Sequence, residues 1–388
     1  MSDLVLNKNL RKIQPSASIL LMDKARQMKA EGADIISLAG GEPDYDTPFA
    51  AARAGIHGIE EGRTHYTAGR GIAPLRKRIE KKLAEENGVL CREVLVTPGC
   101  KYGIFVALMA ILNPGDEVMV LDPSWVSYHA MVRLAGGTPV GVPLSYKDGY
   151  RITKRQLEQY ISGRTRILLL NTPNNPTGRV MDEEEAKDIT DFVRKHGLIL
   201  IADEIYEKII FDGRRHISLG SDPGIAERVI TVNGLSKCAA MTGWRVGYLA
   251  GSKELIDTAY MVYQHTMTCI SEFSQLAALE ALEHPETFAE MRDDYQARRD
   301  LWFDAMREIP SVSMLPAEGT FYAWMKIDKN GMDSGQVCDY LLREAKVVMV
   351  PGIAYNEAEC CVRASLATGT ADLKRAAAAV KKALNGAC

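Results

Sequence analysis

The feature that most constrains the fold is a series of short, continuous apolar segments, each followed by a polar turn and a helical pattern. These segments are residues 94–96, 118–121, 167–170, 198–202 and 229–232. Continuous rather than alternating apolar runs are typical of strands buried on both faces of a mostly parallel sheet. Strands that alternate with helices predict an α/β fold with right-handed crossovers.

Two of the helical segments have recognisable ends. Residues 102–112 have the apolar pattern of a buried helix and run into Asn113, Pro114 and Gly115. Residues 182–196 are amphipathic, with Asp182 as a suitable N-cap and Gly197 as a suitable stop. We therefore expect helices at both places, between strands of the sheet.

The last hundred residues follow a different pattern. A helix is expected near 285–307, followed by shorter strands near 321–327, 347–350 and 361–366 and by a final helix rich in Ala and Lys. This pattern indicates a smaller α+β domain. We predict a large domain of residues 46–284 and a small domain formed by residues 1–45 and 285–388.

Composition and charge exclude several classes of protein. The net charge is -3 and no long run of one sign occurs, so the sequence does not predict a basic surface for nucleic acid. No stretch approaches ~18 uninterrupted apolar residues, so no membrane span is expected, and residues 1–15 lack the apolar centre of a secretory signal. The eight cysteines form no C-x-x-C pair and the seven histidines do not cluster, so we expect no metal and reduced thiols in a cytoplasmic protein.

Because ligands of open α/β sheets bind beyond the carboxyl ends of the strands, the residues that follow each apolar run are candidates for a site. Gly99, Cys100 and Lys101 form a turn into a helix after the first run, which suits an anionic phosphate but is also a common strand-to-helix turn. Trp125 follows the second run, where it would stack on a flat ring or belong to the core.

The next two strand ends carry polar side chains. Residues 171–178 form a constrained loop rich in Asn and Pro, and Asn175 is a suitable donor to a ring oxygen. Asp203 ends the following run, where a carboxylate is costly unless it is paired. Asp203 is therefore either an N-cap or the partner of a cationic ring nitrogen, with Tyr206 donating nearby.

Lys237 follows the last run within a short turn. A lysine in such a place is desolvated, which lowers its pKa and makes it a nucleophile able to form a Schiff base. Residues 242–248 have the pattern of a strand, and Arg245 within it suits a bidentate contact to phosphate. Taken together, the strand ends predict a site for a flat, phosphorylated, cationic aldehyde ring.

The motifs N-N-P-T-G at 174–178, D-E-I-Y at 203–206, and S-K at 236–237 followed by T-G-W-R-V-G-Y at 242–248 occur in one order. This order resembles the class I/II aminotransferases, which are fold-type I enzymes dependent on pyridoxal 5′-phosphate. The likeness covers nearly the whole chain, from residues 15–17 and 39–44 to residues 362–365. It is strongest to the bacterial aspartate aminotransferase branch.

The resemblance implies a role for each motif residue. Lys237 would hold the cofactor covalently and move the proton, Asp203 would pair with the ring nitrogen, and Asn175 and Tyr206 would donate to the ring oxygen. Trp125 would stack on the ring; Gly99, Cys100, Lys101, Ser236 and Arg245 would surround the phosphate, together with Tyr66 from a neighbouring subunit. Arg363, Gly41, Trp125 and Asn175 would bind the substrate. The resemblance thus implies a homodimer that moves an amino group from an α-L-amino acid, aspartate in the first instance, to a 2-oxo acid such as 2-oxoglutarate.

The chain also departs from the family pattern. Gly234, three residues before Lys237, stands where some members carry a serine near the phosphate. Cys100, directly after Gly99, is larger than the glycine that is often found at its own position. No second arginine is evident for a side-chain carboxylate, and Lys101 is the candidate for that contact.

Two alternatives stay open. The first is another reaction on the same fold, such as a β-lyase on cysteine conjugates, a decarboxylase or a racemase; Arg363 argues against decarboxylation because it would keep the α-carboxylate. The second is a non-catalytic regulator with an aminotransferase-like domain. The early start of the motifs leaves no room for a DNA-binding module in front of them.

Overall fold

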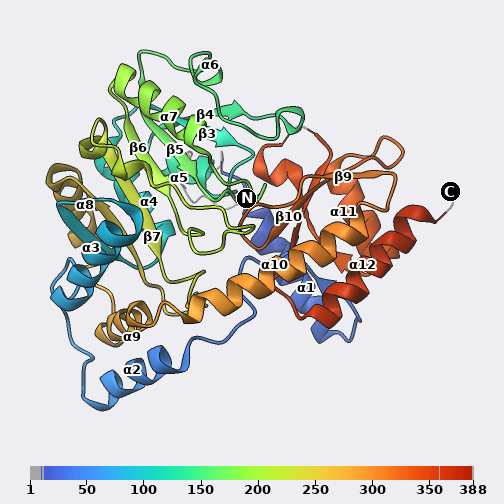
Figure 1. The fold of residues 1–388 in the computed structure, drawn as a ribbon, viewed down its shortest axis with the longest axis horizontal. Coiled ribbons are helices and arrows are strands. Elements are labelled where there is room, and N and C mark those ends of the chain that lie inside the picture. The colour runs from blue at the N-terminus through green and yellow to red at the C-terminus, as the bar shows by residue number, and fades with distance from the viewer. Residues whose placement is uncertain (1–9, 11–12, 358, 387–388) are drawn as a thin grey trace, which may run out of the picture.

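The computed structural model describes residue 10, residues 13–357 and residues 359–386, so expectations for residues 1–9 lie outside the described part. Two lobes are visible, each built on its own sheet (Figure 1). A third, two-stranded pairing joins β1 (Ile36–Ser37) to β11 (Val347–Val348) in parallel. An early segment of the chain therefore belongs to the same lobe as the C-terminal part.

The large sheet has seven strands in the order β2-β8-β7-β6-β5-β3-β4. Their bounds are β2 (Glu93–Thr97), β3 (Glu117–Asp122), β4 (Thr138–Pro143), β5 (Thr165–Asn171), β6 (Ile199–Asp203), β7 (Val229–Gly234) and β8 (Gly247–Gly251). Every strand except β8 runs in the same direction. The predicted mostly parallel sheet is confirmed.

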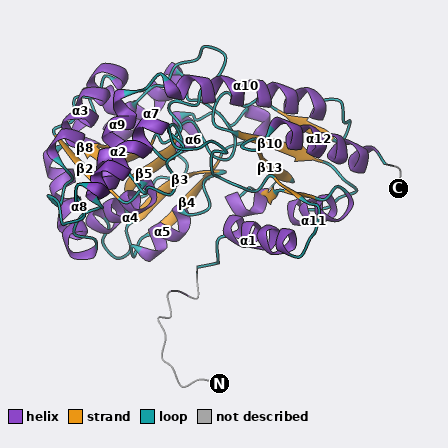
Figure 2. Cartoon of the chain, turned by 90° about the horizontal axis from the view of Figure 1, so that it is seen from below, coloured by secondary structure: helices purple, strands orange, loops and turns teal. Residues whose placement is uncertain are grey.

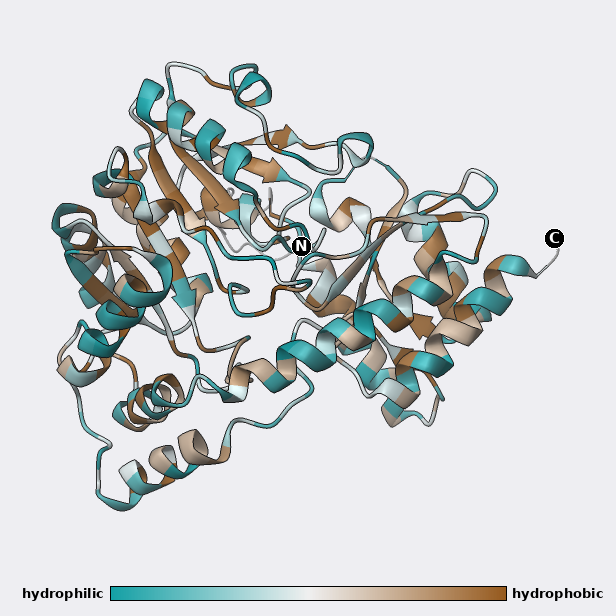
Figure 3. Cartoon of the chain, viewed as in Figure 1, coloured by the Kyte–Doolittle hydropathy of each residue, from teal (hydrophilic) through white to brown (hydrophobic). Residues whose placement is uncertain are grey.

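Helices cover both faces of this sheet, as Figure 2 shows. They are α2 (Phe49–Glu60), α3 (Ala73–Asn87), α4 (Cys100–Ile111), α5 (Tyr128–Leu134), α6 (Lys154–Leu157), α7 (Glu183–His196), α8 (Lys253–Thr266) and α9 (Glu272–Glu283). Alternate residues of one strand enter different cores: Ile167 packs with α4 and α8, whereas Leu168 packs with α7. This two-sided burial explains the continuous apolar runs, which are brown in Figure 3.

The small lobe contains a sheet in the order β12-β13-β10-β9. Its strands are β9 (Val312–Met314), β10 (Tyr322–Ile327), β12 (Val350–Pro351) and β13 (Cys361–Ser365), and its helices are α1 (Ala17–Ala30), α11 (Ser334–Glu344) and α12 (Thr370–Asn385). The long helix α10 (Thr287–Met306) runs from the large lobe along the small one (Figure 1). The predicted domain limits near residues 46 and 285 stay a prediction.

Local signals placed α7 correctly. Asp182 accepts the backbone N–H of Glu185 at 3.0 Å, the Glu185 side chain accepts the N–H of Asp182, and Gly197 ends the helix in the left-handed region at φ 64°.

The predicted strand at 242–248 was wrong over its first part, because β8 begins only at Gly247. Arg245 instead lies in a turn at φ 56°, which reverses the chain before β8 enters the sheet against its neighbours.

None of the helices in the described part of the chain has the length and apolar character needed to cross a membrane. The cytoplasmic location stays a prediction.

Candidate active site

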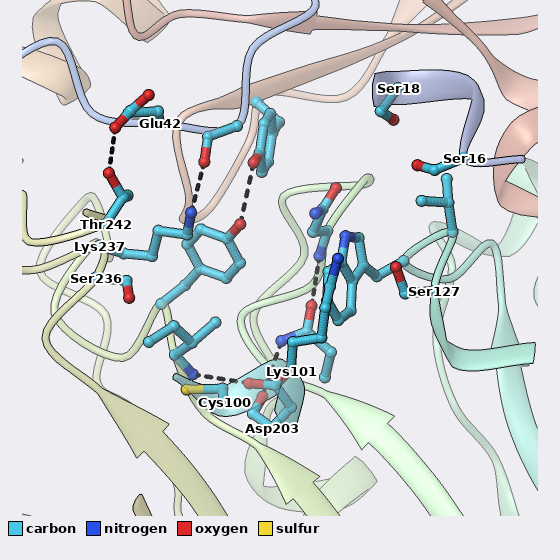
Figure 4. A pocket seen from close by; sticks show the side chains of 18 of the residues that line it. Ser16, Ser18, Glu42, Cys100, Lys101, Ser127, Asp203, Ser236, Lys237 and Thr242 are labelled. Atoms are coloured by element: carbon cyan, nitrogen blue, oxygen red, sulfur yellow. Dashed lines mark hydrogen bonds between the residues drawn. The ribbon is translucent and has the colours of Figure 1, made fainter. Parts of the chain in front are cut away.

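A cavity of about 320 Å³ lies at the carboxyl edge of the large sheet, where the small lobe covers it. Figure 4 shows Lys237, Asp203 and Lys101 around this one space. Most of the residues singled out from the sequence line it: Gly41, Cys100, Lys101, Trp125, Asn175, Asp203, Tyr206, Ser236, Lys237, Arg245 and Arg363. Gly99 and Tyr66 are not among the lining residues.

The topology explains this convergence. Parallel strands finish at the same edge, so the residues that follow β2, β3, β5, β6 and β7 meet there. Because β8 is antiparallel, it begins at this edge, and Arg245 precedes its first residue by two positions. The small lobe contributes Gly41 and Arg363 from the other side of the cavity.

Lys237 is partly buried and its Nζ donates to the carbonyl oxygen of Gly41. Burial lowers the pKa of this amine to about 8. An ordinary lysine titrates near 10.4, so Lys237 has a far larger fraction of neutral, nucleophilic amine at neutral pH. This property is what covalent attachment to a carbonyl requires.

Asp203 is 3% exposed and has no cationic partner within ion-pair distance in the described structure. Its carboxylate accepts the hydroxyl of Tyr128 at 2.7 Å and the backbone N–H of Ile205 at 3.3 Å. Burial raises the pKa of Asp203 to about 6. A buried carboxylate of this kind would be stabilised by a cation that enters the cavity. Sequence reasoning missed Tyr128, although its position three residues after Trp125 was a usable signal.

Asn175 and Tyr206 lie together with a tyrosine that sequence reasoning did not find. The hydroxyls of Tyr206 and Tyr322 are 3.0 Å apart, and the Oδ1 of Asn175 accepts from Arg363 at 3.1 Å. This bond leaves the amide NH₂ of Asn175 for another acceptor. Tyr322 comes from β10 of the small lobe, so no strand-end pattern of the large sheet pointed to it.

The turn before α4 is shaped around Arg245. Gly99 has φ 83°, and a Cβ there would lie 2.5 Å from Nη2 of Arg245. Within the described part of the chain, Arg245 donates to backbone carbonyls alone, those of Thr242 at 2.8 Å and Pro98 at 3.3 Å. Its left-handed backbone costs about 1–3 kcal/mol, a strain typical of ligand sites. A guanidinium beside a helix N-terminus, with no carboxylate partner among the described residues, suits a phosphate.

Gly234 shows why no serine stands at this position. A Cβ there would lie 2.7 Å from the carbonyl oxygen of Val246 and 3.3 Å from the sulfur of Cys100. The backbone of Val246 and Gly247, the latter 2.8 Å away, therefore leaves no room for a side chain at position 234. That the phosphate site has one hydroxyl fewer stays a prediction.

Arg363 is 3% exposed, and its guanidinium lies 4.1 Å from the centre of the Tyr322 ring. Nη2 donates to the carbonyl of Ala39 at 2.8 Å, while Nε has no hydrogen-bond partner. No carboxylate pairs with it among the described residues. A buried guanidinium with a free donor is costly, and an anionic ligand would satisfy it.

The charges of the cavity favour an anionic ligand. Lys101, Lys237, Arg245 and Arg363 face it, whereas Asp203 and Glu42 are the acids that line it. Glu42 is already bound by the hydroxyl of Thr242, the dashed line in Figure 4. Pyridoxal phosphate combines an anionic phosphate with a flat cationic ring, and both the volume and this donor set fit it.

Tyr66 is 86% exposed and lies away from the cavity of its own chain. Its role in a neighbouring subunit stays a prediction.

A further group of ionisable side chains, which begins at the residue after Asp203, does not line the cavity. In the described chain, Glu204, Glu207 and His216 come close enough to share an ion. Lys82 donates to Glu207, and Nε2 of His216 lies 3.0 Å from Oε2 of Glu204.

Comparison with known proteins gives a consistent result. The family described as "Aminotransferase class I and II" matches residues 33–380. An aspartate aminotransferase of Musicola paradisiaca is 39% identical, over 90% of this chain and 89% of the relative. An aromatic-amino-acid aminotransferase of Thermococcus litoralis is 36% identical, over 98% of each chain. The solved aspartate aminotransferase of Thermus thermophilus with maleate has a TM-score of 0.94 at 36% identity and covers 98% of this chain and 100% of that one.

Proposed function

The chain belongs to the class I and II aminotransferases, and we propose from this premise that the residues of the cavity transfer an amino group from an acidic donor. The proposed reaction moves the amino group of an acidic α-L-amino acid to a 2-oxo acid such as 2-oxoglutarate. Pyridoxal phosphate is the proposed cofactor. The observation that carries the proposal is a desolvated Lys237 and an unpaired, buried Arg363 in one cavity.

The cofactor would be held from three sides. The backbone around Gly99, Cys100 and Lys101, together with Ser236 and Arg245, would surround its phosphate. Trp125 would stack on its ring, and Asp203, Asn175 and Tyr206 would contact the polar atoms of that ring. When bound, pyridoxal phosphate supplies an aldehyde that exchanges amines and a cationic ring that accepts the electrons released with the α-proton.

The side chains of this protein perform the remaining work. Asp203 would keep a positive charge at the ring nitrogen, because a buried carboxylate favours a protonated neighbour. Lys237 would act as the base that takes the proton from the substrate α-carbon. Its lowered pKa permits this base role near neutral pH.

Arg363 and the backbone of Gly41 would bind the substrate α-carboxylate. A guanidinium binds a carboxylate through two parallel hydrogen bonds, and Arg363 is fixed between the carbonyl of Ala39 and the ring of Tyr322. A carboxylate held in this way is retained, which favours transamination over decarboxylation.

Lys101 is the proposed contact for an acidic side chain. It lies at the mouth of the cavity with Nζ 4.8 Å from the centre of the Trp125 ring and has no carboxylate partner in the described structure. Ser16 and Ser18, next to and within α1, line the same space. The aspartate aminotransferase named among the relatives supports an acidic donor.

The donor is tested with the cofactor-loaded protein, titrated with single amino acids in the absence of a 2-oxo acid. Aspartate or glutamate should shift the absorbance band of the bound cofactor. In Lys101→Gln, KM for aspartate should rise about tenfold because a charge-assisted contact is lost. KM for alanine, which lacks a side-chain carboxylate, should stay unchanged.

Other outcomes of this titration would contradict the proposal in distinct ways. A response to aromatic or aliphatic amino acids alone would remove the acidic donor and leave the reaction. If no amino acid responds, and pyruvate and ammonia are released from a cysteine conjugate, the β-lyase alternative replaces it.

The proposed homodimer shares its sites between subunits. Tyr66 is fully available to a second chain, and α2 also exposes Phe49 (81%) and Ile59 (53%). Large apolar side chains exposed on one helix favour a protein interface. In the proposed dimer, the partner subunit's Tyr66 reaches the phosphate held by Arg245.

A hybrid dimer tests this sharing. Lys237→Ala and Tyr66→Ala should each be impaired alone at low cofactor concentration. After subunit exchange, a hybrid would contain one intact site, which has Lys237 from one chain and Tyr66 from the other. About a quarter of wild-type activity should return on random reassociation. An active monomer in sedimentation, or no recovery on mixing, would overturn the shared site.

A further inference from the structure

An ion pair between the buried Arg298 and the more exposed Asp44 lies behind the proposed carboxylate site without lining the cavity. Arg298 on α10 is 7% exposed, and its Nη1 donates to both carboxylate oxygens of Asp44 at 2.8 Å. Its Nη2 lies 2.6 Å from Asp294 on the same helix. Neither Asp44 nor Arg298 is among the residues that line the cavity.

This arginine joins the two segments that carry the carboxylate contacts. Asp44 follows Gly41 by three residues, and Arg298 also donates at 3.3 Å to the carbonyl of Leu366, which follows Arg363 by three residues. The same segments meet again at Arg363, whose Nη2 donates to the carbonyl of Ala39.

Tyr295, one turn before Arg298, strengthens the connection. Its hydroxyl donates to Asp44 at 3.2 Å, and its ring lies 5.3 Å from the ring of Phe321. Phe321 directly precedes Tyr322, the ring against which Arg363 lies. One helix thus supports the Gly41 segment, the end of β13 and the start of β10.

We propose that the Asp44–Arg298 pair is a positioning device that sets the distance between the Gly41 backbone and the Arg363 guanidinium. This role rests on the proposed function, because the pair would act only through the carboxylate that the Gly41 backbone and Arg363 bind. A bidentate guanidinium contact tolerates little displacement, so loosening one of the two segments weakens the binding of every substrate that has this carboxylate.

Asp44→Asn in the cofactor-loaded protein tests the device, since this change preserves the shape of the side chain and removes its charge. KM for the amino acid and KM for the 2-oxo acid should both rise about tenfold and by similar factors, because both substrates carry the carboxylate. The dissociation constant of maleate, a dicarboxylate without an amino group, should rise by the same factor. The change in kcat should be smaller, and the absorbance of the bound cofactor should be unchanged.

Arg299→Gln is the matched control. Arg299 is the next residue of α10, is 4% exposed, and makes its own bidentate pair with Asp212 at 2.7 and 2.9 Å. Its loss should lower Tm in a similar way without changing the dissociation constant of maleate.

Arg298→Gln and the double variant complete a mutant cycle. If the pair acts as a unit, Asp44→Asn should add little to Arg298→Gln, whereas its effect should be fully retained in the Arg299→Gln background. An unchanged dissociation constant of maleate in Asp44→Asn, or an equal rise in Arg299→Gln, would overturn the positioning role. Failure of the wild-type protein to bind maleate or any amino acid would instead contradict the proposed function.

Discussion

Replacing Lys237 by alanine should lower the rate of amino-group transfer by about 10⁴-fold, the upper range for loss of a general acid–base. The reason is geometric, since Lys237 follows β7 by three residues and its amine lies in the cavity, where it donates to the Gly41 carbonyl. Its lowered pKa, about 8, reflects burial within the cavity and permits it to act as a base. The measurement is a single-turnover absorbance experiment with saturating amino acid.

Two comparisons make this result specific. Lys253→Ala on α8 removes a lysine that pairs with Asp257 at the surface, and it should retain wild-type rates. A small primary amine added to Lys237→Ala should restore part of the rate, because the missing group is a base. Steady-state transamination close to wild type in Lys237→Ala would refute the assignment.

Asp203→Asn should have the second largest effect, about 10²- to 10³-fold on kcat, comparable to the loss of one preorganised electrostatic contact. The carboxylate is 3% exposed and oriented by Tyr128, so the asparagine fits the same space without the charge. In the absence of a cation, burial raises the pKa of Asp203 to about 6. The destabilising effect of its ionisation therefore grows as the pH rises from about 4 to 6 and is relieved by a cationic ligand.

The control for this prediction is the neighbouring carboxylate. Glu204→Gln also removes a buried acid, but Glu204 points to Ser218 and His216 outside the cavity. It should lower Tm while changing kcat only slightly. If Asp203→Asn keeps full kcat, or if Glu204→Gln loses as much as Asp203→Asn, the ring-nitrogen role of Asp203 is wrong.

The placement of the site illustrates how far strand-end reasoning extends. Asp203, Asn175 and Lys237 were found because each follows a buried strand, and parallel strands bring such positions to one edge. Gly234 was noted as a departure from the family, and its reason emerged only from the structure, because the backbone of Val246 and Gly247 approaches too closely for a side chain. The residue roles remain to be tested by the substitutions above.

The roles of Tyr322 and Arg298 could not be predicted from the sequence, and neither could the pairing of Tyr128 with Asp203. Tyr128 lies 75 residues from Asp203, Tyr322 lies 116 residues from Tyr206, and Arg298 lies 254 residues from Asp44. No local periodicity links such pairs. The turn at Arg245 was missed for a related reason, because the direction in which β8 joins the sheet depends on its neighbours and not on its own composition.

The sequence by itself determined the buried strands, the caps of α7 and the order of the motifs, because these features are written in local burial patterns and turn chemistry. It also determined which side chains end the strands. Only the tertiary structure decided that β8 runs antiparallel, that Tyr66 lies outside the cavity of its own chain, and that α10 connects Gly41 to Arg363 through Arg298. These outcomes depend on contacts between segments far apart in the chain, which form only when the chain has folded.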